Sequence, residues 1–282
     1  MRVMTWNVWW RFGEWERRRE AILAELRRRR PDVVGLQEVW QAGGENLAGW
    51  LADRLGMHWT WAEWERPEPW QARIGAEAGI GVAVLSRWPI AARAAVPLPG
   101  DERADDGRLA LHALIDAPGH PVPFFTAHLA PAPDASALRC RQVSVLAEFI
   151  AEHRAASAFP PVSTGDFNAW PDSDEVRMFG GYKTAPPLPG HVMVDAWGEY
   201  ADPSAPSATW DMAHPQVAAA GGPNIRIDYV HVGLPGPGGL GTVRAVDRAG
   251  TAPVDGVWPS DHMAVLADLV HPGTDGAKTP AS

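Results

Sequence analysis

The stretch PVSTGDFNAWPDSDEVRM, residues 161–178, decides how the rest of the chain is interpreted. Small and apolar residues lead to Gly165, and Asp166 and Asn168 then stand on either side of one Phe. Because side chains alternate along a strand, this spacing predicts that both polar side chains share one face at a strand end. The residues WPD that follow are typical of a turn. A carboxylate that orients or deprotonates water, beside an amide that binds phosphate oxygens, suits a catalytic cleft, and the alternative is a structural Asx-rich turn.

Short apolar runs bounded by Gly, Pro or Asp recur along the chain and predict strands. They are RVMTWNV, DVVGLQEV, GIGVAVLS, RLALHALI, PVPFFTAHL, IRIDYVHV and HMAVLADLV. Helical spacing predicts two long helices, residues 14–29 and 136–153, and the acids of DSDE predict a shorter one after Asp172. Residues 214–223 and 233–241 have the composition of loops. Many strands with few helices in irregular order indicate α/β or α+β sheet packing, not a regular doubly wound fold.

Bulk composition is that of an ordinary globular protein. The 282 residues are 46% hydrophobic and 21% charged, and we expect one domain over residues 1–271 and a disordered tail over 272–282. Cys140 is the only cysteine, so no internal disulfide supports the fold. No apolar run is long enough to span a bilayer. The first residues lack the pattern of a secretory signal, so we expect a cytoplasmic protein if Met1 is the native start.

The formal net charge of −9 gives no general attraction to phosphate polymers. The exception is the run ERRREAILAELRRRR, residues 16–30. Its apolar residues Ile22, Leu23 and Leu26 recur at helical spacing, so we expect the arginines to form a solvated face of that helix.

Further polar residues stand where other apolar runs end or break. Asn7 follows the first run, and Glu38 follows Val33, Val34 and Leu36 in the second. An acid in such a place is either a solvated strand end or a metal ligand. A hard cation such as Mg²⁺ needs only one or two carboxylates beside waters and substrate phosphate.

Histidines and acids complete the pattern in the second half of the chain. His128 is the last residue but one of FFTAHL. RIDYV places Asp228 among apolar neighbours, and SDHMAV sets Asp261 beside His262. A buried Asp228 must find a partner such as histidine or arginine. Taken singly, His128 suits a structural histidine and the Asp-His pair suits a capped turn. Taken together, polar residues at so many strand ends are hard to explain by turn chemistry.

The motifs, in this order, resemble those of the endonuclease/exonuclease/phosphatase superfamily. These metal-dependent phosphoesterases include DNase I, abasic-site endonucleases, neutral sphingomyelinases and inositol phosphate phosphatases. The matching pieces are TWNV, LQEV, GVAVLSRWPI, TAHL, RCRQ, GDFNAWPDSDE, RIDYV and SDHMAV, from residue 5 to about 266. The resemblance implies an α/β fold, a four-layer α/β sandwich in which two packed, largely antiparallel sheets are flanked by helices.

The resemblance also implies a metal site for Mg²⁺, with Mn²⁺ as an alternative. Glu38 matches the principal metal ligand of the family. Asn7 matches the asparagine that supports the metal and phosphate region, and Asp261 matches an additional acid near the metal.

The remaining matches imply catalytic roles. Asp166 matches the acid that orients the attacking water, and Asn168 matches the amide that holds phosphate or transition-state oxygens. His262 matches the histidine that faces the scissile phosphate, and Asp228 matches the acid that hydrogen-bonds it. His128 matches the second histidine of the DNase I and sphingomyelinase branches.

Three functions stay open at this point. The first is a phosphodiesterase with DNA or RNA as the leading substrate, because nucleic acid is frequent in the family. The second is a phosphodiesterase for a lipid headgroup or a small phosphorylated metabolite, which the acidic charge favours slightly. The third is a catalytically silent binding module, which is disfavoured because every matched position keeps its family residue.

Two loop features bear on the substrate. Residues 58–79 hold Trp59, Trp61, Trp64 and Trp70, which either fill the core or form a rim for bases or an apolar group. The resemblance to DNase I implies Glu77 as a candidate partner for His128. Scattered arginines are candidates for a rim that contacts a phosphate backbone: Arg66, Arg73, Arg87, Arg103 and Arg108.

Overall fold

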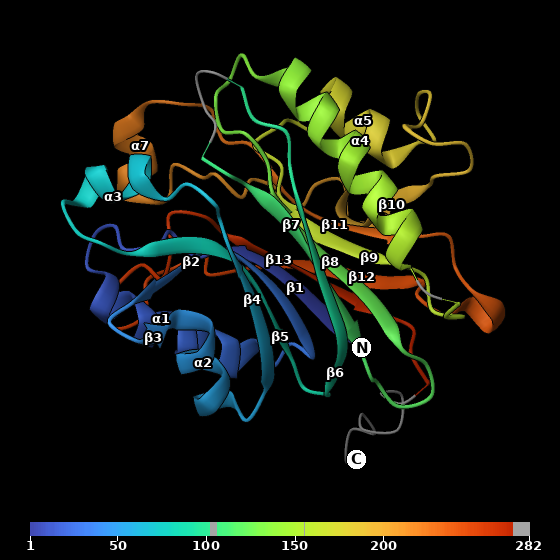
Figure 1. Ribbon diagram of the computed structural model, residues 1–282, viewed down its shortest axis with the longest axis horizontal. Coiled ribbons are helices and arrows are strands. Elements are labelled where there is room, and N and C mark those ends of the chain that lie inside the picture. The colour runs from blue at the N-terminus through green and yellow to red at the C-terminus, as the bar shows by residue number, and fades with distance from the viewer. Residues whose placement is uncertain (102–105, 155, 273–282) are drawn as a thin grey trace.

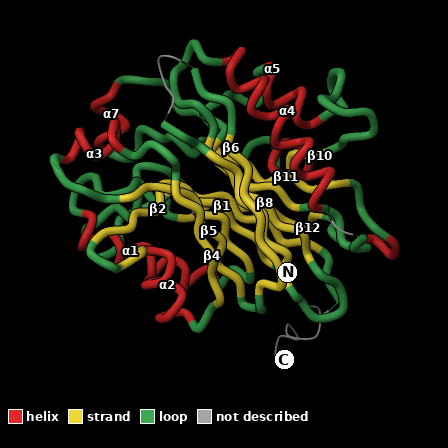
Figure 2. Tube along the Cα trace, in the orientation of Figure 1, coloured by secondary structure: helices red, strands yellow, loops and turns green. Residues whose placement is uncertain are grey.

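The computed structural model describes residues 1–101, 106–154 and 156–272. Two mixed, largely antiparallel sheets pack face to face, and helices flank them on both outer sides (Figures 1 and 2). The predicted four-layer α/β sandwich is confirmed. The predicted tail lies outside the described residues except for Pro272, and Arg103 lies outside them as well.

The first sheet has a path of six strands and one short additional strand. In spatial order the path is β12 (Val243–Ala249), β13 (Ala264–Leu269), β1 (Arg2–Asn7), β2 (Val33–Ala42), β5 (Gly79–Ser86) and β4 (His58–Glu63), and β3 (Glu45–Asn46) pairs with β2. The pair β1–β2 is parallel, and the other pairs are antiparallel.

The second sheet has six strands. In spatial order they are β10 (Met193–Asp195), β11 (Asp228–Gly233), β9 (Val162–Asp166), β8 (Val122–His128), β7 (Leu109–Ile115) and β6 (Ile90–Pro97). Among the described strands of this sheet, only β8 and β9 run parallel.

The described residues form seven α-helices and one 3₁₀ turn, Pro237–Gly239. The helices are α1 (Trp15–Arg29), α2 (Leu47–Leu55), α3 (Glu68–Ile74), α4 (Ser136–His153), α5 (Asp174–Gly180), α6 (Ala196–Tyr200) and α7 (Pro215–Ala220). In Figure 1, α1 and α2 lie on the outer side of the first sheet, and α4 and α5 lie on the outer side of the second. The helices predicted near residues 14–29 and 136–153 and after Asp172 are therefore confirmed. No helix among the described residues is both long and apolar enough to cross a membrane.

The prediction of a loop over residues 214–223 is wrong, because α7 forms there. His214 caps this helix by accepting the backbone N–H of Gln216, and Pro215 occupies the first turn, where its missing N–H costs nothing. Gly221 ends the helix in the left-handed conformation at φ 70°. These signals lie within a run of Ala, Gly and Pro whose composition resembles that of a loop.

A glycine lets the two sheets approach closely. Gly35 lies on β2, and a Cβ atom there would lie 2.2 Å from Oγ1 of Thr164 and 2.8 Å from Oγ1 of Thr126. Both threonines belong to the facing sheet, on β9 and β8. Because any side chain at position 35 would overlap with them, the spacing between the sheets at this point requires glycine.

Strand direction determines where the polar residues gather. The chain leaves β1 at Asn7, β8 at His128 and β9 at Asp166, and it enters β11 at Asp228. Register pairs Asp166 with Asp228 on one side and with His128 on the other. The loop before β13 brings His262 to the same end of the sandwich. Both sheets therefore contribute to a single site.

Candidate active site

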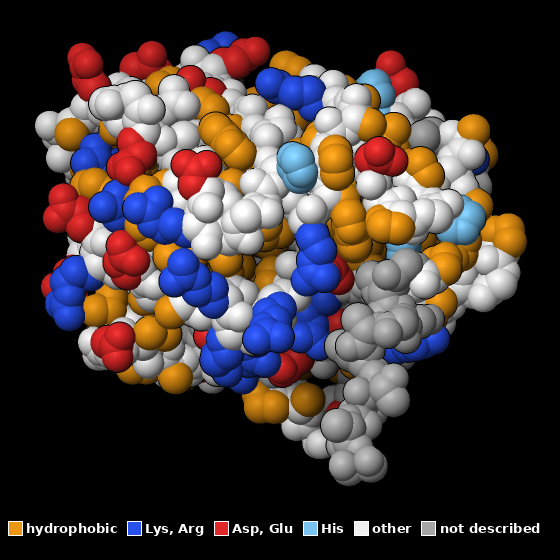
Figure 3. Space-filling view, turned by 90° about the horizontal axis from the view of Figure 1, so that it is seen from below, with side chains coloured by type: hydrophobic (Ala, Val, Ile, Leu, Met, Phe, Trp, Pro, Cys, Tyr) orange, Lys and Arg blue, Asp and Glu red, His pale blue; other side chains and the backbone are white. Residues whose placement is uncertain are grey.

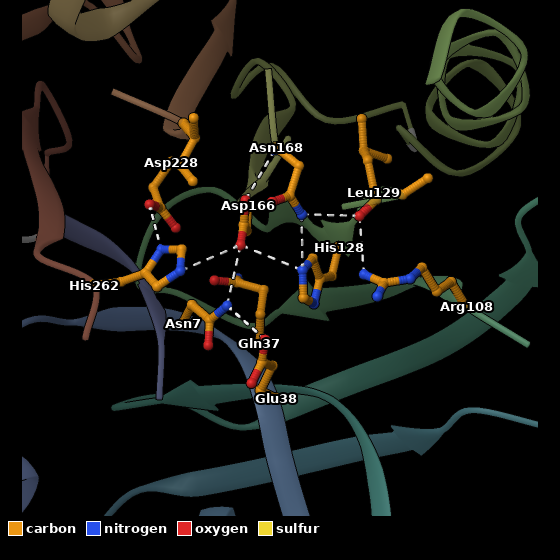
Figure 4. Close-up of polar contacts among 12 residues, drawn as sticks. Asn7, Gln37, Glu38, Arg108, His128, Leu129, Asp166, Asn168, Asp228 and His262 are labelled. Atoms are coloured by element: carbon orange, nitrogen blue, oxygen red, sulfur yellow. Dashed lines mark hydrogen bonds and ion pairs between the residues drawn. The ribbon is translucent and has the colours of Figure 1, made fainter. Parts of the chain in front are cut away.

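Asp166 is the centre of a buried polar cluster (Figure 4). Asn7 Nδ2 donates to Asp166 Oδ2 at 3.0 Å and to Glu38 Oε1 at 3.0 Å. Asn7 and Glu38 lie on the first sheet and Asp166 lies on the second, so one amide connects the sheets. All three side chains are buried.

Two imidazoles face the Asp166 carboxylate. His128 Nε2 lies 3.2 Å from Asp166 Oδ2, and His262 Nε2 lies 3.8 Å from the same oxygen. The other ring nitrogen of His262, Nδ1, lies 2.9 Å from Asp228 Oδ2. The predicted partner for the buried Asp228 is therefore a histidine, and His262 lies between two carboxylates.

These contacts shift the pKa values of the acid and the base in opposite directions. Burial alone would raise the pKa of Asp166, but the imidazoles of His128 and His262 and the hydrogen bond from Asn7 hold that pKa well below its usual range. Burial alone would lower the pKa of His262, but the carboxylates of Asp228 and Asp166 raise it well above its usual value. The arrangement therefore favours the carboxylate form of Asp166 and the imidazolium form of His262.

Glu38 projects into the site from an irregularity inside β2, not from the strand end that the sequence predicts. The strand continues to Ala42, but its pairing with β5 shifts register between Leu36 and Val39, and Glu38 adopts φ 57°. Such a bulge redirects a side chain relative to its neighbours. Glu38 Oε2 is buried and has no hydrogen-bond partner in the described structure. A buried, unpaired carboxylate oxygen is costly unless it binds a cation.

Asn168 does not share a strand face with Asp166, so that prediction is wrong. β9 ends at Asp166, Asn168 adopts φ 49°, and Asp166 Oδ1 accepts the backbone N–H of Asn168 at 2.9 Å. This is the Asx turn that the sequence left as the alternative. The turn itself carries Asn168 into the site, because its Nδ2 donates to Leu129 O at 3.0 Å and lies 3.1 Å from His128 Nε2.

Asp261 lies beside this cluster as a further buried acid. Burial, together with the negative charges of Glu38 and Asp166, raises the pKa of Asp261 to about 7, although His262 and Arg18 oppose the rise. The preceding Ser260 donates its Oγ–H to Asn7 O at 2.6 Å. This bond fixes the loop that carries Asp261 and His262 against the end of β1.

Arg18 supports the site in a way that the sequence did not reveal. The expectation of a solvated arginine face is wrong for this residue, which is only 3% exposed, and burial lowers its pKa to about 10. It donates to the carbonyl oxygens of Val8, Trp9, Trp10 and Pro259. It thereby holds the turn after Asn7 against the loop before Asp261. Its spacing of four residues from Ile22 was the available signal, because that spacing places both on one helix face.

Arg108 supports the other side of the site and does not form a rim. It is 3% exposed, pairs with Asp106 at 2.9 Å and donates to Leu129 O at 2.8 Å. Asn168 uses the same carbonyl oxygen, so Arg108 and Asn168 are linked through it (Figure 4). The Arg108 guanidinium lies 4.5 Å above the Trp64 ring, and this ring lies 5.5 Å from the His128 ring.

The tryptophans of residues 58–79 divide between the two interpretations left open. Trp64 and Trp70 are buried, Trp61 is half-buried and Trp59 is 41% exposed. Trp64 and Trp70 therefore fill the interior, although most residues of this segment are exposed. Glu77 is exposed, and His128 lies against Asp166 instead, so the candidate pairing of Glu77 with His128 is not formed.

One group of side chains offers metal-ligand atoms close together. Oxygen or nitrogen atoms of Asp166, Asp228 and His262 lie within 4.8 Å of one another. Asn7, His128, Asn168 and Asp261 are in hydrogen-bond or electrostatic contact with this group, and Glu38 is linked to it through Asn7. All eight residues singled out in the sequence therefore gather at one place.

Known proteins of similar structure cover nearly the whole chain. D. rerio TDP2 complexed with a single-strand DNA product matches with a TM-score of 0.75 at 19% identity, over 96% of this chain and 99% of that one. The human Nocturnin catalytic domain with bound sulfate matches with a TM-score of 0.68 at 20% identity, over 96% and 94%. An endonuclease/exonuclease/phosphatase from Beutenbergia cavernae matches with a TM-score of 0.67 at 25% identity, over 95% and 71%.

A comparison with curated protein sequences found no match. The sequence profile of the Endonuclease/Exonuclease/phosphatase family matches residues 4–272. The chain therefore belongs to the Endonuclease/Exonuclease/phosphatase family.

Proposed function

We propose that the protein is a divalent-metal-dependent phosphodiesterase that hydrolyses its substrate by in-line attack of water. The observation that carries this proposal is the arrangement around Asn7, which holds Glu38 and Asp166 together while Glu38 Oε2 stays buried and unpaired. Such an arrangement offers one carboxylate oxygen to a cation and a second carboxylate to water.

The donor set fits a hard cation such as Mg²⁺ or Mn²⁺. Four buried carboxylates, those of Glu38, Asp166, Asp228 and Asp261, lie in one cluster. A bound divalent ion would offset this excess of negative charge, and oxygen ligands are those that Mg²⁺ prefers. We assign Glu38 as its principal ligand, with Asn7 and Asp261 beside it. The alternative set of Asp166, Asp228 and His262 is less suitable, because the His262–Asp228 contact of 2.9 Å is a hydrogen bond.

Asp166 orients the attacking water. Its lowered pKa makes it a weak base, so positioning contributes more than proton abstraction. The bonds from Asn7 and from the backbone of Asn168 fix both of its oxygens. A fixed carboxylate holds a water in line with the phosphorus, which removes much of the entropic cost of attack.

His262 and Asn168 bind the phosphate oxygens on which negative charge develops. The Asp228 carboxylate keeps a proton on Nδ1 of His262 and favours the imidazolium, so Nε2 can donate toward phosphate. Asn168 would add an amide N–H from the turn after β9, besides the one that Leu129 O accepts. The bound metal would supply Lewis-acid stabilisation of the same charge.

Nucleic acid is the leading substrate class in this proposal. Trp170 follows Asn168 by two residues and is 47% exposed, and the Trp210 ring lies 5.1 Å from the His262 ring. Aromatic rings beside a phosphodiester site suit stacked bases. The complex of D. rerio TDP2 with a single-strand DNA product supports the same class. A lipid headgroup or small phosphorylated metabolite is the second candidate, which the net charge of −9 favours.

A substrate panel tests this proposal. We expect Mg²⁺-dependent cleavage of single-stranded oligonucleotides, no cleavage with EDTA, and loss of turnover by orders of magnitude in Asp166→Asn. Hydrolysis of bis-p-nitrophenyl phosphate or of a phospholipid, without cleavage of the oligonucleotides, would favour the second candidate. Metal binding without turnover on any of these substrates would contradict the proposal and favour a binding module.

A further inference from the structure

Four arginines line a hollow of about 240 Å³ that is separate from the candidate active site. It lies where α1 and α2 end and where the chain leaves β5. Its described lining residues include Arg27, Arg30, Arg54 and Arg87 but no Asp or Glu, and Leu26 and Met57 contribute apolar surface. Figure 3 shows Lys and Arg side chains gathered on the face of the molecule seen from below.

The hollow and the candidate active site lie toward opposite ends of the first sheet. Arg30 and Pro31 precede β2, whereas Glu38 lies five residues beyond its first residue, Val33. At roughly 3.3 Å per strand residue, this separates the two by about 17 Å along the strand. A ligand in the hollow would therefore not lie on the reacting phosphate.

The arginines of the hollow differ from their neighbours in the run RRRR, residues 27–30. Arg28 pairs with Glu25, and Arg29 pairs with Glu25 and Asp247. By contrast, Arg27 and Arg30 have no carboxylate within 4 Å among the described residues. The two central arginines are thus neutralised, and the two that line the hollow are not.

The other two arginines also keep donors available. Arg54 donates to Trp50 O at 3.3 Å, and its guanidinium lies 3.9 Å above the Trp50 ring, with no carboxylate partner among the described residues. Arg87 pairs with Asp32 at 2.9 Å, yet its side chain is 54% exposed. Each guanidinium has five N–H donors, so these contacts leave several unused.

Helix ends alone do not explain this grouping. Cations near a helix C-terminus are favoured by the macrodipole, which accounts for arginines at the ends of α1 and α2. Arg87 follows a strand, however. Arg30 ends α1 in the left-handed conformation at φ 50°, a position that glycine usually takes and that Gly56 takes at the end of α2. Position 30 therefore carries an arginine side chain although its left-handed backbone conformation favours glycine.

We propose that this hollow binds a compact phosphate-bearing anion. Guanidinium groups match phosphate oxygens in bidentate geometry and stay charged at any physiological pH. The protein as a whole is acidic, so this concentration of arginines, three of which have no carboxylate partner among the described residues, is a local property. The anion is a free phosphorylated molecule or the headgroup of a lipid, and the cations converge on one hollow instead of following an extended backbone.

Calorimetric titration with inorganic pyrophosphate tests the proposal. EDTA in the buffer removes metal-dependent phosphate binding at the candidate active site. We expect one binding site in the unmodified protein and at least a tenfold rise in Kd in the double variant Arg27→Gln/Arg30→Gly. Glycine suits the left-handed position at residue 30, so this variant should keep its fold, which circular dichroism checks.

The matched control is Arg17→Gln/Arg141→Gln, which removes the same charge from exposed positions on α1 and α4. Its Kd should stay within twofold of the unmodified protein. An equal loss in the control, or no pyrophosphate binding in the unmodified protein at low salt, would overturn the proposal.

Two further arms identify the source of the phosphate. Sedimentation with phosphatidylcholine vesicles that contain a phosphatidylinositol phosphate, lost in Arg27→Gln/Arg30→Gly, would support a lipid headgroup. Pyrophosphate binding without sedimentation would support a free anion. The unmodified protein could instead bind a single-stranded oligonucleotide but not pyrophosphate, and lose that binding in the same variant. This result would show a nucleic-acid surface and overturn the proposal of a compact anion.

Discussion

Asn7 donates one amide group to Asp166 across the interface between the two sheets. The bond from Nδ2 to Asp166 Oδ2 is 3.0 Å long, and the same nitrogen reaches Glu38 Oε1 at 3.0 Å. Asn7 Oδ1 in turn accepts the backbone N–H of Trp9 at 2.9 Å, which fixes the orientation of the amide. The relative position of the two carboxylates therefore depends on this one side chain.

Replacing Asn7 by Ala should lower kcat/KM by about 10²-fold, because a carboxylate displaced by about 1 Å no longer positions water correctly. Steady-state hydrolysis of bis-p-nitrophenyl phosphate with Mg²⁺ measures the effect. Asn46→Ala is the control, because Asn46 caps α2 away from the site. It should cost about 1 kcal/mol of stability and leave turnover unchanged. Equal activity of Asn7→Ala and the unmodified protein would argue against this role for Asn7.

Gly35→Ala should destabilise the protein by about 1–3 kcal/mol, because the added methyl group overlaps with Thr164 and Thr126 on the facing sheet. Urea unfolding measures the change. The double variant Gly35→Ala/Thr164→Ala should recover part of the loss, since it removes the closest atom. Full stability of the single variant would show that the sheets tolerate a wider spacing.

Arg108→Met should cost about 3–5 kcal/mol of stability, because it leaves the Asp106 carboxylate buried without a cation. The double variant Asp106→Asn/Arg108→Met should be more stable than the single one, since no unpaired charge remains. Thermal and urea unfolding of the three proteins give the comparison. If the double variant lost more than the single one, the ion pair would not be the source of the effect.

His231 should make the protein less stable in mild acid. Burial, together with Arg226 and His191, lowers its pKa to about 4, although Asp195 opposes this, and neither ring nitrogen has a hydrogen-bond partner in the described structure. The folded-state pKa lies below the unfolded value of about 6.5, so the stabilisation is complete above pH 6.5 and is lost as the pH falls toward 4. Between pH 7.5 and 5 the free energy of unfolding should fall by about 2 kcal/mol from this group.

His231→Phe should remove this part of the pH dependence, because a phenyl ring takes up no proton and His231 already packs among Phe167, Phe179 and Tyr229. Urea unfolding at both pH values measures it. The control His58→Gln replaces an exposed histidine. Its free energy of unfolding should change with pH in the same way as that of the unmodified protein. If the free energy of unfolding of His231→Phe also fell as much as that of the unmodified protein, His231 would not be the cause of the lower stability in acid.

Local sequence patterns were enough to predict most strands, the long helices and the polar residues at strand ends, whereas the two packed sheets and the gathering of those residues at one site followed from the family resemblance. Strand-like runs that end in Asn7, His128 and Asp166 identify the site, because strands that pair in register bring their ends together. The buried Asp228 required a partner, and His262 provides it. These inferences succeed because apolar runs and the polar residues that end them are local properties of the sequence.

The other features depend on tertiary contacts. The bulge at Glu38 arises from a shift in pairing with β5, which no residue type in LQEVW specifies. Arg18 and Arg108 look like surface cations in the sequence and are buried because backbone carbonyls and Asp106 satisfy them. Asn168 enters the site through a left-handed turn, which the alternation rule for strands does not describe.

The dependence of turnover on Mg²⁺ concentration in Glu38→Gln tests the central claim most directly. Hydrolysis of bis-p-nitrophenyl phosphate is measured from EDTA-treated protein upward, with Glu45→Gln as a control for the loss of an exposed acid. We predict no turnover without metal, a normal curve for Glu45→Gln, and a requirement for about 10²-fold more Mg²⁺ or no turnover in Glu38→Gln. Turnover that survives EDTA, or a Glu38→Gln curve that matches the unmodified protein, would contradict the account.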